Sequence, residues 1–97
     1  SPGGTFNDIH EPAVAATYTH LFAELGRRGI AWLHLAGTDP GFDLPALARS
    51  AQAPVILSGG YDRARAEADL AAGRGAAVSF GATFIANPDL PERLRRN

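Results

Sequence analysis

Val-Ser-Phe-Gly-Ala-Thr-Phe-Ile-Ala-Asn-Pro-Asp-Leu-Pro-Glu-Arg-Leu, residues 78–94, is the stretch that decides the fold. A short apolar run ends at Gly81, and an aromatic segment, an Asn-Pro-Asp break and a basic tail follow. Residues 54–61, Pro-Val-Ile-Leu-Ser-Gly-Gly-Tyr, repeat this design, with glycines between an apolar run and a helix. Strands that end in glycine and lead into helices hold phosphate groups in parallel α/β proteins. Since the last two strands of a (β/α)8 barrel carry this site most often, the pattern predicts the final portion of such a barrel.

The length and composition of the chain limit what it can be. It has 97 residues, whereas a complete barrel needs roughly 250. The chain begins at Ser1 and contains no methionine, so we expect a processed or cleaved piece of a longer protein. A hydrophobic fraction of 45% and a net charge of −1 indicate a globular chain.

The charge balance and the lack of cysteine exclude several classes of function. Nine basic and ten acidic residues leave no surplus that would favour nucleic acid as a partner. Without cysteine, neither a disulfide framework nor a thiolate metal site can form. No apolar run approaches the ~20 residues of a membrane span, and no signal peptide is visible. We therefore expect a cytoplasmic protein with no membrane partner.

Hydrophobic periodicity predicts alternating helices and strands. Residues 30–36 form a near-continuous apolar run, which is typical of a strand buried on both faces of a parallel sheet. Asp43 and Asp62 are placed to cap helices, and Gly29 and Gly73 to end them. The predicted order is a helix from Pro12 to Gly29, a strand at 30–36, a short helix after Asp43, a strand at 54–57, a helix from Asp62 to Ala72, a strand at 76–80 and a helix at 91–96. We expect three parallel, adjacent strands in sequence order with right-handed connections.

Gly59, Gly60 and Gly81 are the strongest candidates for a binding site. Their N–H groups can face a phosphate, or the glycines can simply make tight turns between strand and helix. Two adjacent strand ends with this design favour the phosphate site.

Other polar and aromatic residues carry weaker signals. His34 is most simply a hydrogen-bonded interior histidine, because it alternates with apolar residues along one strand face. His10 and His20 have no partner at metal-ligand spacing, so we expect no metal site. Phe6 either lines a ligand pocket or is an ordinary loop phenylalanine. The aspartates are read as turn or cap residues: Asp39, Asp43 and Asp62.

Four segments resemble the C-terminal part of the Old Yellow Enzyme family: residues 1–8, 32–35, 58–61 and 80–90. Members of this family are FMN-dependent NAD(P)H oxidoreductases on a (β/α)8 barrel, and they reduce activated alkenes such as enones. The resemblance covers essentially the whole chain and implies about strands six to eight with their helices. Residues 1–97 would then be the C-terminal fragment of a single FMN-binding barrel domain.

The resemblance also implies roles for particular residues. The FMN phosphate would be held at Ser58, Gly59, Gly60, Gly81 and Ala82, and Phe6 would line the substrate side of the flavin. No catalytic residue of the family falls within this chain. Two positions depart from the family pattern, because Ala82 stands where arginine usually contacts the phosphate and Ala76 stands where an aspartate is common.

Two functions of different classes follow. The chain is either part of an ene-reductase, inactive alone and completed by the rest of the barrel, or a non-catalytic fragment that assembles through its exposed strand edges. Open edges on a three-stranded sheet favour a partner in both cases, either the remainder of the barrel or another copy in an oligomer. We expect one sheet face without an opposite wall, formed by Trp32, His34, Val55, Leu57 and Val78.

Overall fold

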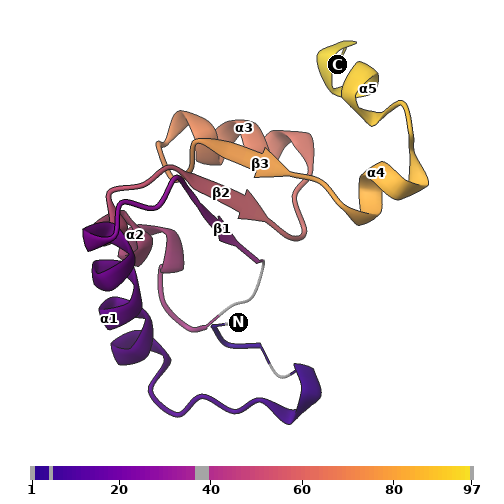
Figure 1. The fold of residues 1–97 in the computed structure, drawn as a ribbon. Coiled ribbons are helices and arrows are strands. Elements are labelled where there is room, and N and C mark those ends of the chain that lie inside the picture. The colour runs from indigo at the N-terminus through magenta and orange to yellow at the C-terminus, as the bar shows by residue number, and fades with distance from the viewer. Residues whose placement is uncertain (1, 5, 37–39, 97) are drawn as a thin grey trace.

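The computed structural model describes residues 2–4, 6–36 and 40–96 (Figure 1). Three strands form one parallel sheet in the order β1-β2-β3, which confirms the predicted order and direction. The predicted turn role of Asp39 lies outside the described residues. The elements are η1 (Phe6–Asp8), α1 (Val14–Arg27), β1 (Leu33–Leu35), α2 (Leu44–Ala48), η2 (Arg49–Ala51), β2 (Val55–Ser58), α3 (Arg63–Ala71), β3 (Ala77–Ser79), α4 (Ala82–Ala86) and α5 (Leu90–Arg96).

The helix boundaries follow from local chemistry that the sequence shows. The Asp43 carboxylate accepts a hydrogen bond of 3.1 Å from the Ala46 N–H, and Asp62 accepts one of 2.8 Å from the Arg65 N–H. Each carboxylate satisfies an amide that has no partner within its helix, so both predicted caps are confirmed. Gly29 follows α1 and Gly73 follows α3, with φ of 65° and 70°, a backbone conformation that glycine adopts at little cost.

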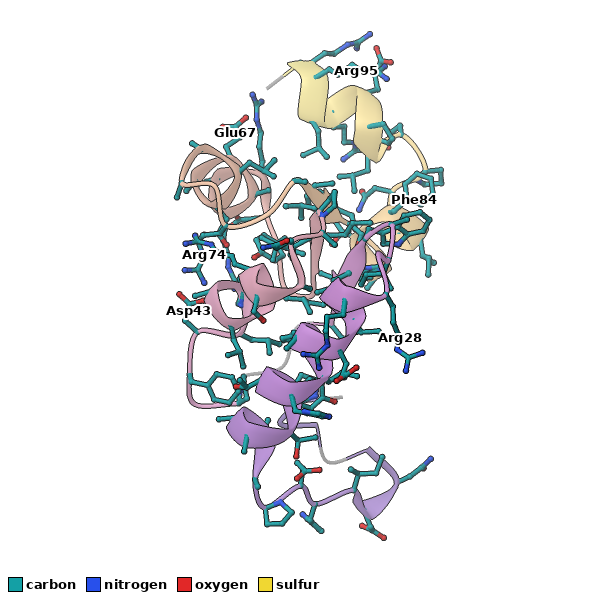
Figure 2. All side chains as sticks on the ribbon, turned by 60° about the vertical axis from the view of Figure 1, so that its left-hand side comes forward. Arg28, Asp43, Glu67, Arg74, Phe84 and Arg95 are labelled. Carbon is teal, nitrogen blue, oxygen red and sulfur yellow. The ribbon has the colours of Figure 1, made fainter. Side chains whose placement is uncertain are left out.

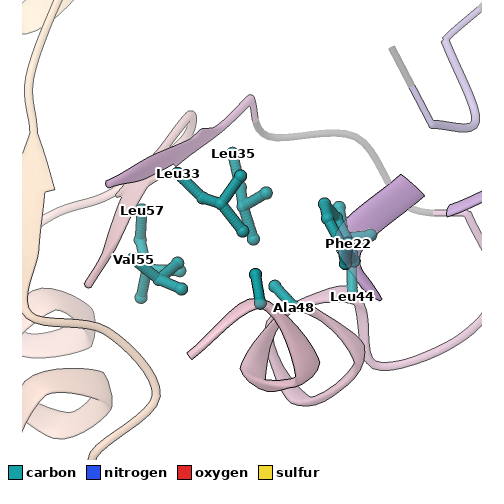
Figure 3. Close-up of a cluster of buried hydrophobic side chains, with 8 residues drawn as sticks. Phe22, Leu33, Leu35, Leu44, Ala48, Val55 and Leu57 are labelled. Carbon is teal, nitrogen blue, oxygen red and sulfur yellow. The ribbon is translucent and has the colours of Figure 1, made fainter. Parts of the chain in front are cut away.

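The hydrophobic core lies between the sheet and the helices α1 and α2 (Figure 3). In the strand register, Leu33 lies beside Val55 and Leu35 beside Leu57, so these side chains share one face of the sheet. They pack with Phe22 of α1 and with two residues of α2. Full burial of a leucine or valine side chain contributes roughly 1.5–3 kcal/mol, so this face holds the described elements together. The buried cluster comprises Phe22, Leu33, Leu35, Leu44, Ala48, Ala51, Val55 and Leu57.

The register corrects the expected composition of the open face. Val55 and Leu57 are 6% and 2% exposed, because the helices cover them, and Val78 pairs with Leu57 on the same face. Trp32 is 60% exposed, and His34 is exposed on the opposite face. Grouping Val55, Leu57 and Val78 with Trp32 and His34 was therefore wrong. Burial of residues 30–36 on both faces was also wrong for this chain, since β1 is buried on one face only.

The C-terminal segment contains a helix that the sequence pattern did not predict. Helix α4 begins directly after Gly81, and α5 follows the Asn-Pro-Asp break. Both helices extend away from the sheet (Figure 1). Phe84 and Ile85 of α4 are 46% and 82% exposed, so this helix presents apolar side chains with no cover from the described chain. Among the described residues, no helix is both long enough and apolar enough to cross a membrane.

Candidate phosphate-binding edge

The glycines after β2 and β3 emerge at the same edge of the sheet. Ser58, the last residue of β2, lies beside Ser79, the last residue of β3. Gly59 and Gly60 follow Ser58 directly, and Gly81 comes two residues after Ser79. Parallel neighbours end at the same edge, so the structure brings the three predicted glycines to adjacent strand ends.

The backbone at this edge needs glycine and leaves donors free. Gly59 and Gly60 have φ of 96° and 64°, values that side-chain-bearing residues rarely adopt. Within residues 2–4, 6–36 and 40–96, the N–H groups of Gly60, Gly81 and Ala82 donate to no other residue. A Cβ built on Gly81 would meet no atom within 4 Å, so the space in front of this glycine is open. Open space and unpaired amides are what an anion requires.

Ser58 and Ala82 complete the predicted set. Ser58 is half-buried, and its side chain shares a sheet face with Ser79 because the two residues pair in register. Ala82 is the first residue of α4, and no side chain of the described residues caps this helix. It therefore offers a backbone N–H but no charge.

Arg65 is a charged residue at this edge that the sequence interpretation missed. Its Nη1 donates to the Gly60 carbonyl oxygen at 3.3 Å, and its guanidinium lies 4.4 Å from the centre of the Tyr61 ring. The signal was present in the sequence, since Arg65 comes three residues after the Asp62 cap. That position is in the first turn of α3, beside the glycine turn.

A series of polar contacts connects Tyr61 to Asp43, the N-cap residue of α2. The Tyr61 hydroxyl donates to Asp69 Oδ2 at 2.7 Å, and Arg74 Nε lies 3.3 Å from Asp69 Oδ1. Arg74 also contacts both carboxylate oxygens of Asp43, at 2.9 and 3.2 Å, and Figure 2 shows these two side chains together. A pocket of about 270 Å³ lies beside this chain of contacts, with Phe42, Tyr61, Arg65 and Arg74 among its lining residues.

These contacts shift two pKa values in opposite directions. The Ala46 N–H, and after it the Arg74 guanidinium, lower the pKa of Asp43 because both stabilise the carboxylate. Burial, and after it the Asp69 carboxylate, raise the pKa of Tyr61 because both disfavour the phenolate. Tyr61 therefore stays a neutral hydrogen-bond donor to Asp69 over the physiological pH range.

The structure describes the side chains of the three histidines but not that of Phe6. His34 Nε2 lies 3.0 Å from Ser79 Oγ, which confirms a hydrogen-bonded histidine, although it is exposed in this chain rather than interior. His10 and His20 are exposed. Phe6 belongs to the turn η1, but its side chain lies outside what the structure describes, so its substrate role stays a prediction.

Solved structures match this chain over nearly its whole length. A morphinone reductase variant in complex with tetrahydroNAD is 37% identical, with a TM-score of 0.88 over 98% of this chain and 27% of that one. TcOYE in complex with pHBA is 30% identical, with a TM-score of 0.90 over 99% of this chain and 27% of that one. Both are barrels, and the chain matches about a quarter of each.

Curated relatives agree with the solved structures. Aldehyde reductase FrzD of Cladobotryum sp. is 33% identical over 95% of this chain and 26% of the relative. A 12-oxophytodienoate reductase-like protein of Solanum lycopersicum is 30% identical over 100% of this chain and 27% of the relative. The chain spans between 26% and 35% of the first curated relatives that it matches. No protein-family model matches the chain.

The parallel strands and the helices that join them define this chain as part of a (β/α)8 barrel. Its three strands and their helices correspond to the C-terminal part of that barrel. The chain belongs to the Old Yellow Enzyme family, since the relatives and structural neighbours that cover it are members of that family.

Proposed function

We propose that this chain is the phosphate-binding part of an FMN-dependent oxidoreductase that uses NAD(P)H to reduce activated alkenes. The observation that carries the proposal is a set of N–H groups without a partner among the described residues, those of Gly60, Gly81 and Ala82, at the ends of two adjacent parallel strands. Ser58 and Gly59 belong to the same edge. Residues 1–97 are the C-terminal part of a single FMN-binding barrel domain.

The residues at this edge fit the phosphate group of FMN. A phosphate is small, carries negative charge and accepts several hydrogen bonds, and backbone amides at glycine turns are suited to it. The absence of a Cβ at Gly59, Gly60 and Gly81 lets an anion approach the backbone closely. Phe6 would line the substrate side of the flavin, as the resemblance implies.

The residues of this chain bind and orient the cofactor, and the flavin carries out the hydride transfer. When bound, FMN accepts hydride equivalents from NAD(P)H and passes them to an electron-poor alkene. The amides at the edge would hold the phosphate end of the cofactor and so help to orient it. No residue of this chain is assigned a proton transfer, so the segment alone is expected to be inactive.

The remainder of the barrel is the favoured partner of the open sheet face. Trp32 is 60% exposed, and the solved structures that match this chain are barrels of about four times its length. The other candidate is a non-catalytic fragment that pairs with a second copy through its strand edges, which the short, uncovered strands β1 and β3 also permit.

Flavin binding by the full-length protein tests the proposal. Purified full-length protein is expected to be yellow, to release FMN on denaturation, and to oxidise NADH or NADPH when an enone such as cyclohexenone is added. A correctly folded full-length protein that is colourless and does not bind added FMN would contradict the proposal. An oligomer of the 97-residue chain without flavin would support the non-catalytic alternative.

A further inference from the structure

The Arg65 side chain contacts the glycine turn that follows β2. Its Nη1 lies 3.3 Å from the Gly60 carbonyl oxygen and would lie 3.7 Å from a Cβ on Gly60. Its main-chain N–H is held by the Asp62 cap at 2.8 Å. The contact with the Gly60 carbonyl oxygen therefore places the guanidinium beside this residue.

Arg65 differs from two other arginines near this edge, because it has no carboxylate partner among the described residues. Across the part of the chain that the structure describes, no ion pair involves Arg65. Arg63, two residues before Arg65 on α3, pairs with Glu67 at 2.6 Å. Arg74, which lines the same pocket, pairs with Asp43 and Asp69. Arg65 thus contributes a net positive charge to this edge.

Tyr61 holds the guanidinium over the turn. The Arg65 guanidinium lies 4.4 Å from the Tyr61 ring centre, within the range of a cation–π contact. The ring is itself fixed, because its hydroxyl donates to Asp69 at 2.7 Å. One of the five N–H donors of the guanidinium is used on Gly60, and the others remain for a ligand.

We infer that Arg65 supplies the side-chain charge for the FMN phosphate at this edge and that Tyr61 positions it. The inference rests on the proposed function, because it names the cation of the proposed phosphate site. Arg65 approaches from α3, on the β2 side of the site. Ala82, on the β3 side, has no charge to offer.

Comparison of FMN with riboflavin tests the role of Arg65. Riboflavin has the same ring system and no phosphate, so it reports general damage to the flavin site. In the full-length protein, Arg65→Gln is expected to raise the Kd for FMN by about tenfold to a hundredfold, the range for a charge-assisted contact. The Kd for riboflavin should stay within about twofold, and FMN binding should depend less on salt.

Arg63→Gln is the matched control, because it removes an equal charge from the same end of α3. It should leave the Kd for FMN within about twofold, since Glu67 already neutralises that arginine. Equal loss of FMN and riboflavin in Arg65→Gln, or no loss of either, would overturn the inference while leaving the proposed function intact. A wild-type protein that binds riboflavin and FMN equally would overturn the inference and the proposed phosphate site together.

A second pair of variants tests the positioning by Tyr61. Tyr61→Phe keeps the ring under the guanidinium and loses only the hydroxyl contact to Asp69, so it should weaken FMN binding less than Tyr61→Leu does. Tyr61→Leu removes the ring and should weaken FMN binding while riboflavin binding stays unchanged. An equal effect of the two variants on FMN would show that the ring does not position Arg65.

Discussion

His34 Nε2 of β1 lies 3.0 Å from Ser79 Oγ of β3, so a side-chain hydrogen bond reaches across the intervening strand β2. The contact lies on the sheet face opposite the helices, because His34 alternates with the buried Leu33 and Leu35. Ser79 comes two residues before Gly81. The bond therefore links the first strand to the strand end that carries part of the proposed phosphate site.

We expect this bond to contribute measurably to the stability of the full-length protein. A neutral hydrogen bond contributes roughly 0.5–1.5 kcal/mol. In a double-mutant cycle of His34→Ala and Ser79→Ala, followed by urea unfolding, the coupling free energy should be about 1 kcal/mol. Strictly additive losses for the two substitutions would show that the side chains do not interact in the complete barrel.

Adding an arginine at position 82 should tighten FMN binding. Ala82 offers only its backbone N–H, and a charge-assisted hydrogen bond is worth roughly 1.5–3 kcal/mol. Ala82→Arg in the full-length protein should lower the Kd for FMN about tenfold to a hundredfold and increase its salt dependence. The expected gain is larger in the Arg65→Gln background, where no other charge is proposed to face the phosphate.

The matched control for this prediction is Ala86→Arg, which adds the same charge four residues further along, at the end of α4. FMN titration by fluorescence quenching measures both variants. If Ala82→Arg leaves the Kd unchanged in both backgrounds, the phosphate does not bind beside Ala82.

The lowered pKa of Asp43 predicts a loss of stability in acid. Because its folded-state pKa lies below the ordinary aspartate value of about 3.8, the ionised carboxylate stabilises the fold above that value. The contribution is lost as the pH falls through the folded-state pKa. Asp43→Asn keeps an N-cap but removes the charge that faces Arg74, so the full-length protein should lose stability at pH 7.

The size of this loss is expected to be modest, since both partners of the Asp43–Arg74 pair are more than a third exposed and exposed pairs contribute about 1 kcal/mol or less. Urea unfolding at pH 7 and at pH 3 measures it. The difference between wild type and Asp43→Asn should shrink at pH 3. A difference that is as large at pH 3 as at pH 7 would exclude the charge as its cause.

Expressed alone, the 97-residue chain should associate or bind a hydrophobic dye. Its open sheet face and α4 present exposed apolar side chains, among them Trp32, Phe84 and Ile85, and exposed patches of this kind favour association. Sedimentation velocity and dye fluorescence measure the two effects, with the full-length protein as the control. A monomeric chain with no dye binding would contradict this expectation.

Local chemistry in the sequence was sufficient to predict the order of the strands and of the α-helices other than α4, together with the main candidates for the site. Asp43 and Asp62 are confirmed as caps, because a cap depends on residues only three positions apart. The parallel order β1-β2-β3 follows from alternating apolar runs and amphipathic helices. Gly59 and Gly60 after β2 were predicted because a turn with positive φ leaves a signature in residue type. Gly81 after β3 has a φ of −98°, and it was predicted from its place at the end of an apolar run and from the family resemblance.

Tertiary structure alone decided which residues meet across the sheet. A shift of one residue in register turns every side chain of a strand to the other face, and periodicity within a strand does not reveal its register against a neighbour. The packing of α1 and α2 selects the face with Val55 and Leu57 as the core, which is why these residues were wrongly grouped with Trp32. The approach of Arg65 to Gly60 and the bond from His34 to Ser79 have the same origin, since both depend on how far a side chain reaches once the elements are packed.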